Sequence, residues 1–317
     1  MTPPFSSQSQ SKSQSQIFAV LATRYRIVHV TTYEYTEPVS LCQNVAHLAA
    51  RPCAHQSNSS PVLTISPEPA VIEERVDYFG NPVHYFTIQE PHRQLTVRVD
   101  HVIGVAPRPS PAATSTPAWE AVRNRLTTDR GAAWLDAARF AFDSRYVAAH
   151  PRYADFAGPS FPPGRPVLAA ALDLVHRVHT GFAFDPQATT LATPVREVFE
   201  KRRGVCQDFA HLLLACLRSL GLAARYVSGY LCTVPPPGTP RLVGADATHA
   251  WVSLFCGDAG WVDLDPTNDQ IPADRHVLLA WGRDYDDVSP LKGVILGGGQ
   301  HRVKVAVDVS PTRPQVG

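Results

Sequence analysis

The segment CQDFAHLLLACLRSLG at positions 206–221 constrains the fold of this chain more than any other part of its sequence. Its apolar residues recur every three or four positions, which is the pattern of a helix with one buried face. They are Phe209, Leu212, Leu213, Cys216, Leu217 and Leu220. Gly221 follows the last of them, where a helix is expected to end. The segment therefore predicts a helix packed on a core, with Cys206 in its first turn.

Cys206 is the candidate nucleophile among the cysteines at 42, 53, 206, 216, 232 and 256. In the first turn of a helix, unpaired N–H groups and the helix dipole stabilise the thiolate, which is the reactive form of cysteine. The basic run KRR at 201–203 adds positive charge, and the polar Gln207 follows. The other cysteines are interpreted as small buried residues, Cys216 most clearly because it lies on the apolar face.

A nucleophilic cysteine requires a base within hydrogen-bond reach and usually a third group that orients the base. The segment HAWVSLFC at 249–256 alternates as a strand does, and GDAG at 257–260 has the composition of a turn. WVDLDPTN at 261–268 then completes a predicted hairpin. His249, at the start of this hairpin, is the candidate base.

The register of that hairpin leaves two residues open as the third group. Pairing Cys256 with Trp261 closes the hairpin through the GDAG turn. In that register Asn268 falls opposite His249. Asp265 lies about 10 Å from the opposed position at ~3.3 Å per residue, so a bulge, a twist or a longer turn must close the gap. Spacing alone therefore predicts His249 with either Asp265 or Asn268.

The sequence predicts neither a metal nor a cofactor. His176 and His179 lie three residues apart on a predicted helix and are interpreted as surface residues. His211 follows Cys206 by five residues and does not share its helical face, which disfavours a metal site formed by these two residues with His249. No DxDxDG loop is present, so calcium binding is not supported.

The length of 317 residues predicts more than one domain. Residues 1–16 are rich in Ser and Gln, which favours disorder. Short β-rich runs follow, separated by turns such as GNP at 80–82, whereas 119–142 is mostly helical in pattern and 151–166 is Pro-rich and reads as a loop. The sequence HRVKVAVDV at 301–309 predicts a closing strand. The predicted parts are a disordered tail at 1–23, a β-domain at 24–106, an α+β core at 107–290, and a C-terminal strand and tail at 291–317.

The composition and net charge of the chain indicate which class of protein it is and which partners are not expected. The hydrophobic fraction is 44% and the charged fraction 18%, as in soluble globular proteins. A net charge of +1 predicts neither a nucleic acid nor a membrane as partner. No apolar run reaches the ~18 residues of a membrane span, and the run at 17–22 is short for a signal peptide. Six cysteines without a CxxC pair favour a reducing compartment, so we expect a cytoplasmic protein.

Three segments resemble the core of the transglutaminase-like superfamily: GVCQDFAHLLLACLRSLGLAARYVSGY at 204–230, HAWV at 249–252 and WVDLDPTN at 261–268. Residues 24–44 and 77–97 resemble the N-terminal β-region of its bacterial members. The resemblance implies an α+β fold in which an N-terminal β-sandwich-like domain precedes a papain-like core of the cysteine protease type. It also implies a catalytic triad of Cys206, His249 and Asp265, and this implication favours Asp265 over Asn268.

Such a triad implies chemistry on a peptide or amide substrate. The thiolate of Cys206 attacks the amide carbonyl and forms an acyl-thioester. Release to water makes the enzyme a peptidase or amidase, which is the leading prediction, and release to an amine makes it a transglutaminase. The backbone N–H of Cys206 is a candidate oxyanion donor, and EKRR at 200–203 offers no glutamine as the second. The alternative function is a catalytically silent binding or assembly protein that retains the fold.

Overall fold

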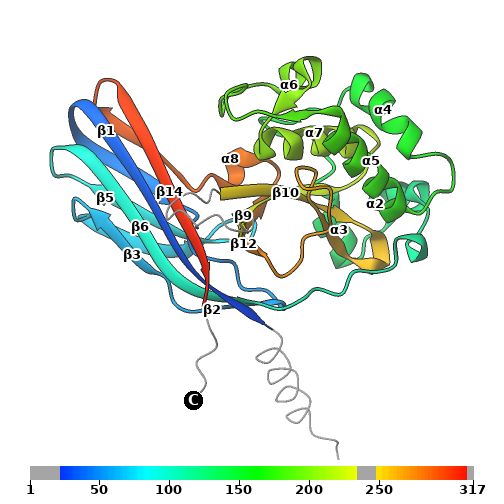
Figure 1. The fold of residues 1–317 in the computed structure, drawn as a ribbon, viewed down its shortest axis with the longest axis horizontal. Helices are drawn as coiled ribbons and strands as arrows, with labels where there is room; N and C mark the ends of the chain where they lie inside the picture. Colours follow the sequence, from blue (N-terminus) through cyan, green and yellow to red (C-terminus); the bar gives the residue numbers. More distant parts are fainter. Residues whose placement is uncertain (1–21, 234–247, 313–317) are drawn as a thin grey trace, which may run out of the picture.

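The structure is a computed structural model that describes residues 22–233 and 248–312. It has a strand-rich region, built from both ends of the described chain, and a second region in which helices cover a smaller sheet (Figure 1). This α+β architecture confirms the predicted fold class. The tail predicted at 1–16 lies outside the described residues.

The strand-rich region is an eight-stranded sheet organised around one long strand, β1 (Thr23–Ala46). The first half of β1 pairs with β6 (His92–Val105) and β14 (His301–Pro311), and its second half pairs with β5 (Pro82–Ile88) and β13 (Leu291–Gly297). In Figure 1 the blue β1 and the red β14 run side by side. The remaining strands are β2 (Gln56–Asn58), β3 (Val62–Ser66) and β4 (Val71–Val76).

The C-terminal strands therefore belong to the same sheet as the N-terminal ones. The strand predicted at 301–309 is β14, whose partner is the strand at the start of the described chain. The alternating pattern of 301–309 predicts a strand but does not identify its partner, because pairing over such a separation leaves no local signal. The strand-rich region is therefore completed by residues from the far end of the sequence.

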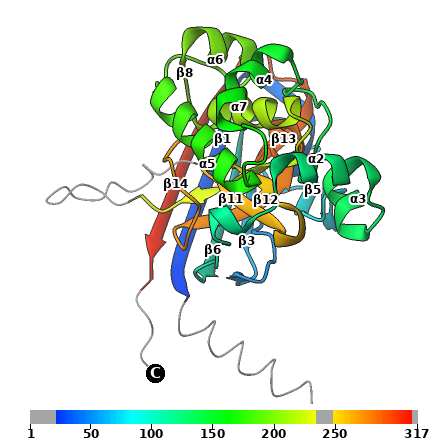
Figure 2. The ribbon, with the colours of Figure 1, turned by 90° about the vertical axis from the view of Figure 1, so that its right-hand side faces the viewer.

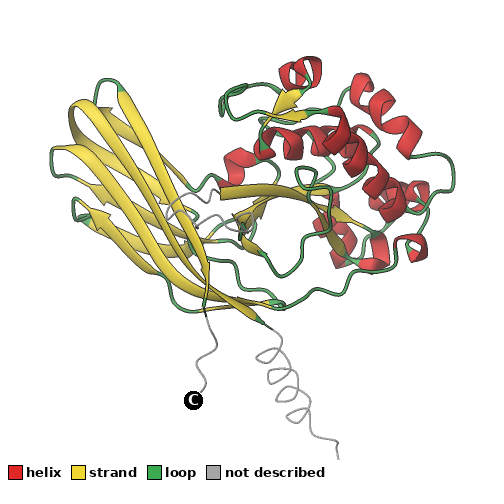
Figure 3. Cartoon of the chain, in the orientation of Figure 1, coloured by secondary structure: helices red, strands yellow, loops and turns green. Residues whose placement is uncertain are grey.

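The second region is built on a four-stranded sheet in the order β11-β10-β9-β12. Helices gather on one side of this sheet (Figure 3) and α7 crosses among them (Figure 2). The strands are β9 (Ala224–Leu231), β10 (Thr248–Phe255), β11 (Trp261–Leu264) and β12 (His276–Gly282). The helices are α2 (Trp119–Thr128), α3 (Ala132–Ala138), α4 (Pro151–Ala157), α5 (Val167–Gly181), α6 (Val195–Lys201), α7 (Cys206–Ser219) and α8 (Tyr285–Val288).

The remaining short elements are the two-residue strands β7 (Ala183–Phe184) and β8 (Arg203–Gly204) and three 3-10 turns. These turns are η1 (Ala113–Ser115), η2 (Gly158–Ser160) and η3 (Gly257–Ala259). Within the described ranges, no helix is both long and apolar enough to cross a bilayer.

Helix α7 is the central element of the core, as its sequence pattern predicts. Leu212, Leu213 and Leu217 are fully buried and pack with Ala250 and Val252 of β10. Burying one leucine side chain contributes ~1.5–3 kcal/mol, so this face alone holds the helix firmly on the sheet. Its first turn, and with it Cys206, is therefore placed on a rigid support.

The segment predicted as mostly helical at 119–142 is confirmed as two helices, α2 and α3. They are separate because the Asp129 carboxylate accepts a hydrogen bond from the Gly131 backbone (2.8 Å) and the chain turns there. The loop predicted at 151–166 contains α4 instead. Pro151 occupies its first turn, where a helix does not need the missing N–H.

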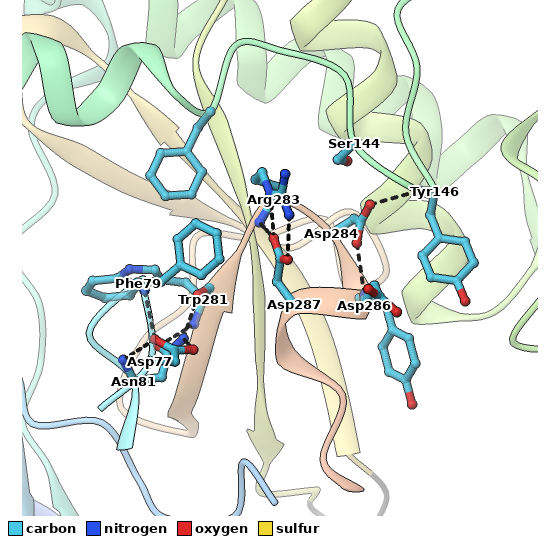
Figure 4. A network of polar contacts seen from close by, with 12 residues as sticks. Asp77, Phe79, Asn81, Ser144, Tyr146, Trp281, Arg283, Asp284, Asp286 and Asp287 are labelled. Atoms are coloured by element: carbon cyan, nitrogen blue, oxygen red, sulfur yellow. Dashed lines mark hydrogen bonds and ion pairs between the residues drawn. The ribbon is translucent and has the colours of Figure 1, made fainter. Parts of the chain in front are cut away.

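The turn at Gly80-Asn81 docks the strand-rich region onto β12 (Figure 4). The Asn81 side chain donates a hydrogen bond to the Trp281 carbonyl (2.9 Å) and accepts one from the Trp281 N–H (3.0 Å). Asp77 holds this amide in place, accepting a hydrogen bond from Asn81 Nδ2 (2.7 Å). The same figure shows Asp284 accepting a hydrogen bond from the Tyr146 backbone (2.8 Å), which ties α8 to the helical layer.

Candidate active site

Cys206 opens helix α7, as predicted, and is half-buried. The Asp208 carboxylate accepts hydrogen bonds from the Val205 backbone (2.8 Å) and from the Thr189 hydroxyl (2.7 Å), so it caps the start of the helix. A Cβ at Gly204 would lie 2.8 Å from the Cβ of Asp208, so the close approach of the chain before Cys206 requires glycine there.

The basic run at 201–203 is engaged away from the cysteine. Lys201 bonds Glu197 (2.5 Å), and Arg203 lies 3.6 Å from Asp185. The Arg202 guanidinium lies 4.7 Å from the centroid of the Phe182 ring, over its face. The positive charges of this run are therefore engaged by residues other than Cys206.

The hairpin that carries His249 has a different register from the predicted one. Phe255 pairs with Trp261, so the predicted pairing of Cys256 with Trp261 is wrong by one residue. The cause is the 3-10 turn at Gly257–Ala259, which is closed by a hydrogen bond from the Cys256 N–H to the Gly260 carbonyl (2.8 Å). Strand β11 then ends at Leu264.

Asp265 lies in a tight turn just beyond β11. Its Oδ1 accepts hydrogen bonds from the backbone N–H groups of Thr267 (3.0 Å) and Asn268 (3.2 Å), and its backbone bridges to Gln270. This turn, rather than strand pairing, brings the carboxylate to the histidine. His249 Nε2 lies 2.8 Å from Asp265 Oδ2, with 8% and 0% of the two side chains exposed.

Asn268, the competing residue, supports the aspartate. Its side-chain amide donates a hydrogen bond to Asp265 Oδ2 (2.7 Å) and lies 3.4 Å from His249 Nε2. The shorter contact to the histidine comes from the carboxylate. The structure therefore brings His249 and Asp265 into direct contact, with Asn268 beside them.

The charges of these buried groups stabilise one another. Burial alone would lower the pKa of His249, but hydrogen-bonding and coulombic interactions with Asp265 and Cys206 raise it to about 10. Burial would likewise raise the pKa of Asp265, yet hydrogen bonds from His249 and His276 hold it well below its usual range. Cys206, His249 and Asp265 thus form one interacting set in which the imidazolium form of the histidine is favoured.

His276, on β12, is a member of this network that the sequence does not predict. Its Nε2 lies 3.0 Å from Asp265 Oδ2, and its side chain is buried. Burial lowers the pKa of His276, so it is neutral and donates from Nε2 to the carboxylate. No local motif marks this residue, because only the pairing of β12 with β9 carries it to the site.

Two histidines of α5 form hydrogen bonds with the turn that holds Asp265. His176 Nδ1 lies 2.7 Å from Asp269 Oδ2, and His179 Nδ1 lies 2.9 Å from the Thr267 carbonyl oxygen. Both histidines were predicted to lie on the surface, and the His176 side chain is indeed 64% exposed. Their contacts nevertheless link the turn to a helix of the core.

Three residues of metal-ligating type meet in this network, His249, Asp265 and His276, with one ligand atom of each within 4.8 Å of the others. The Nε2 atoms of both histidines are directed at the same Asp265 oxygen and are used in hydrogen bonds to it. The arrangement therefore fits an imidazole–carboxylate network. His211 lies outside it, with Nε2 accepting a hydrogen bond from the Tyr285 backbone (3.2 Å).

A cleft of about 660 Å³ lies between the two regions of the molecule and reaches residues next to the site. It is lined by Thr248, the neighbour of His249, and by Leu191, whose carbonyl accepts a hydrogen bond from the Gln207 side chain (3.3 Å). Four tyrosines from both regions contribute to its walls, at positions 33, 35, 146 and 285. The cleft thus ends at sequence neighbours of the site rather than at Cys206 or His249 themselves.

Comparison with known proteins identifies the family. The model of the bacterial transglutaminase-like N-terminal region matches residues 25–104, and that of the transglutaminase-like superfamily matches 161–266. An uncharacterized protein of Mycobacterium tuberculosis (strain H37Rv) is 42% identical over 296 residues, covering 91% of this chain and 93% of that protein. This chain belongs to the transglutaminase-like superfamily. The resemblance on which the triad was predicted is thereby confirmed.

Two further proteins and one solved structure are similar to this chain. An uncharacterized protein of Mycobacterium leprae is 33% identical over 293 residues, covering 90% of this chain and 98% of that protein. A protein-glutamine gamma-glutamyltransferase of Pseudomonas aeruginosa is 31% identical over 107 residues, which are 33% of this chain and 16% of that one. A solved structure of a candidate cysteine protease from Cytophaga hutchinsonii superposes with a TM-score of 0.72 at 20% identity, covering 93% of both chains. This likeness confirms the fold.

Proposed function

We propose that this protein is a cysteine-dependent acyl-transfer enzyme that cleaves an amide bond through an acyl-thioester on Cys206. One observation carries the proposal: the buried His249–Asp265 pair, joined at 2.8 Å, interacts with a cysteine that opens a helix. A base held by a carboxylate and facing a thiol is the arrangement that nucleophilic catalysis by cysteine requires.

In the proposed reaction His249 already holds the proton of the Cys206 thiol, so the sulfur is a thiolate paired with an imidazolium. The sulfur attacks the carbonyl carbon of the amide, and the electron pair of the C=O bond moves to oxygen. The oxyanion then collapses, the C–N bond breaks, and the His249 imidazolium gives its proton to the departing amine. Water, deprotonated by His249, releases the acyl group as a carboxylic acid and restores the thiolate paired with the imidazolium. Asp265 stays ionised throughout and stabilises the imidazolium.

Two groups are candidates for oxyanion donors. The backbone N–H of Cys206 lies at the helix start, and one such donor contributes ~3–4 kcal/mol in comparable enzymes. Tyr226 of β9 is buried and close enough to Cys206 for the negative charge of the thiolate to raise the pKa of its phenol, which burial raises first. We propose its neutral hydroxyl as the second donor.

The substrate approaches through the cleft between the two regions, because its walls include Thr248 and Leu191 beside the reacting groups. Hydrolysis is the proposed outcome. The name of the Pseudomonas aeruginosa relative, a gamma-glutamyltransferase, makes a glutamine side-chain amide a suitable first acyl donor to test.

The rate of Cys206 alkylation by iodoacetamide, followed by mass spectrometry between pH 5 and 9, tests the nucleophile. Cys53, which is partly exposed, serves as the control thiol within the same molecule. We expect Cys206 to react on a plateau that extends to pH 6, and His249→Ala to abolish this plateau without changing Cys53. If Cys206 follows the pH dependence of Cys53 in both proteins, the proposed activity fails.

A glutaminyl peptide with and without a fluorescent primary amine then distinguishes the two outcomes of the acyl-enzyme. Free acid formed at the same rate in the presence of the amine supports hydrolysis. Incorporation of the amine in place of acid identifies a transferase. A reactive Cys206 with neither product from a broad set of amides supports the silent binding protein instead.

A further inference from the structure

A second cavity, of about 1110 Å³, lies on the face of the four-stranded sheet opposite α7. Val227 and Leu278 line it and belong to a small apolar cluster with Trp251. Residues of β10 on the alternate positions, such as Val252, pack on the side of α7. The cavity is therefore separated from helix α7 by the sheet itself.

One wall of this cavity holds a buried cation, Arg225, for which the described residues provide no hydrogen-bond acceptor at Nε. Arg225 is 7% exposed, and its guanidinium carbon lies 3.5 Å from the ring centroid of Trp281 and 4.2 Å from that of Trp261. Two indole rings therefore contact the guanidinium, and these contacts leave its N–H groups available for hydrogen bonds. Among the described residues, its Nε has no hydrogen-bond partner.

Asp263, the carboxylate nearest in charge balance to Arg225, already accepts hydrogen bonds from other residues. Asp263 interacts with Arg225 through its charge, but it accepts hydrogen bonds from Arg108 and from Trp251 Nε1 (3.0 Å). Arg108 in turn has two further buried nitrogens, Nε and Nη2, that lack a partner within the described residues. Unpaired buried cations are unfavourable, so the wall is short of one anion.

The charged side chains that line the cavity also indicate that one negative charge is missing. Two guanidinium groups, Arg108 and Arg225, and one carboxylate, Asp263, leave a net charge of +1 on the cavity wall. His55 does not add to it, because burial lowers the pKa of His55 to about 4. Burial also lowers the pKa of Arg225 to about 9, which reflects the unfavourable environment of this charge. A single negative charge would neutralise the wall.

We propose that this cavity binds an organic carboxylate with one negative charge, which pairs with the N–H edge of Arg225 while its apolar body fills the remaining space. The planar edge of a guanidinium matches a carboxylate in two parallel hydrogen bonds. Val227, Ile271 and Leu278 provide apolar contacts for the body. The site is distinct from Cys206, although Trp251 connects the two, since its ring centroid lies 5.3 Å from that of His276.

Isothermal titration calorimetry of the full chain with 3-phenylpropionate, its amide and inorganic phosphate tests the ligand class. We expect 1:1 binding of the carboxylate with a change in tryptophan fluorescence, because Trp261 and Trp281 flank Arg225. The uncharged amide should bind at least tenfold more weakly. Absence of carboxylate binding at millimolar concentration, or equal binding of amide or phosphate, would overturn the proposal.

Substitutions locate the site. Arg225→Gln and Arg108→Gln should each weaken carboxylate binding at least tenfold, whereas Arg123→Gln should not, since Arg123 stacks on Trp119 (5.0 Å) outside the cavity. Ala259→Trp places a large side chain at an exposed lining position and should block binding with every charge intact, even if Arg225→Gln does not fold. Retained binding in Ala259→Trp, or loss of binding after alkylation of Cys206, would overturn the assignment.

Discussion

Asp263 and Asp265 lie two residues apart in the WVDLDP segment, and they show how partners decide the chemistry of a side chain. Both carboxylates are largely or fully buried. Asp263 is bonded by the Arg108 guanidinium and the Trp251 indole, which do not exchange protons near neutral pH. Asp265 is bonded by the imidazoles of His249 and His276, side chains that can gain and lose a proton.

The difference arises where β11 ends. Asp263 is still in the ladder, paired with Ser253, and so its side chain is directed to the face of the sheet away from α7. Leu264 is the last residue of the strand, and Asp265 enters the turn that brings it to His249. A strand shifted by one residue would turn the Asp263 side chain to the opposite face of the sheet.

The sharpest test of this comparison replaces each carboxylate by its amide. Asp265→Asn should lower kcat/KM for an amide substrate by about 10⁴-fold, because the amide stabilises neither the imidazolium nor the correct tautomer. Asp263→Asn should leave kcat/KM of the folded protein within about tenfold and act mainly on thermal stability. Equal losses of activity in both variants would show that the two residues do not differ in role.

The second test uses pH, because Asp265 is paired with His249 and this pairing raises the pKa of the histidine. A raised pKa of about 10 for His249 contributes stability that is complete below its unfolded value of 6.5 and is lost as pH rises toward 10. The free energy of unfolding of wild type relative to His249→Gln should therefore fall by roughly 5 kcal/mol at most over this range. Urea denaturation at pH 6.5 and pH 10 measures it, and a pH-independent difference would contradict the proposed ion pairing.

A smaller effect is expected at His276, which positions Asp265 without facing the thiol. His276→Phe removes one hydrogen bond to the carboxylate, which contributes ~1–2 kcal/mol. We therefore expect Cys206 alkylation at pH 6 to slow by about tenfold. His101→Phe is the matched control, because this histidine is also buried but has no hydrogen-bond partner within the described chain. An equal slowing in the control would indicate a general loss of packing.

The smallest effect is expected at the hydrogen bonds between α5 and the Asp265 turn. His176→Ala removes an exposed contact to Asp269, and exposed ion pairs contribute ~0–1 kcal/mol. The melting temperature and the alkylation rate of Cys206 should change little, the rate by less than about threefold. A larger loss of reactivity with unchanged stability would make His176 a positioning residue of the site.

The sequence by itself determined the elements whose signals are local. Helix α7 and the position of Cys206 in its first turn follow from a periodic apolar face and a capping glycine. The hairpin of His249 follows from strand alternation around a glycine-rich turn, although its register differs by one residue. The choice of Asp265 over Asn268 came from family resemblance, since spacing left both open.

The tertiary structure decided everything that depends on which segments meet. Three features depend on such meetings: the pairing of β13 and β14 with β1, the approach of His276 to Asp265, and the contacts of Arg225 with Trp261 and Trp281. Periodicity reports only which face of a segment is buried, over a few residues. The burial and pairing of a charge depend on the whole closed chain, because only then is water excluded and a partner placed within hydrogen-bond distance.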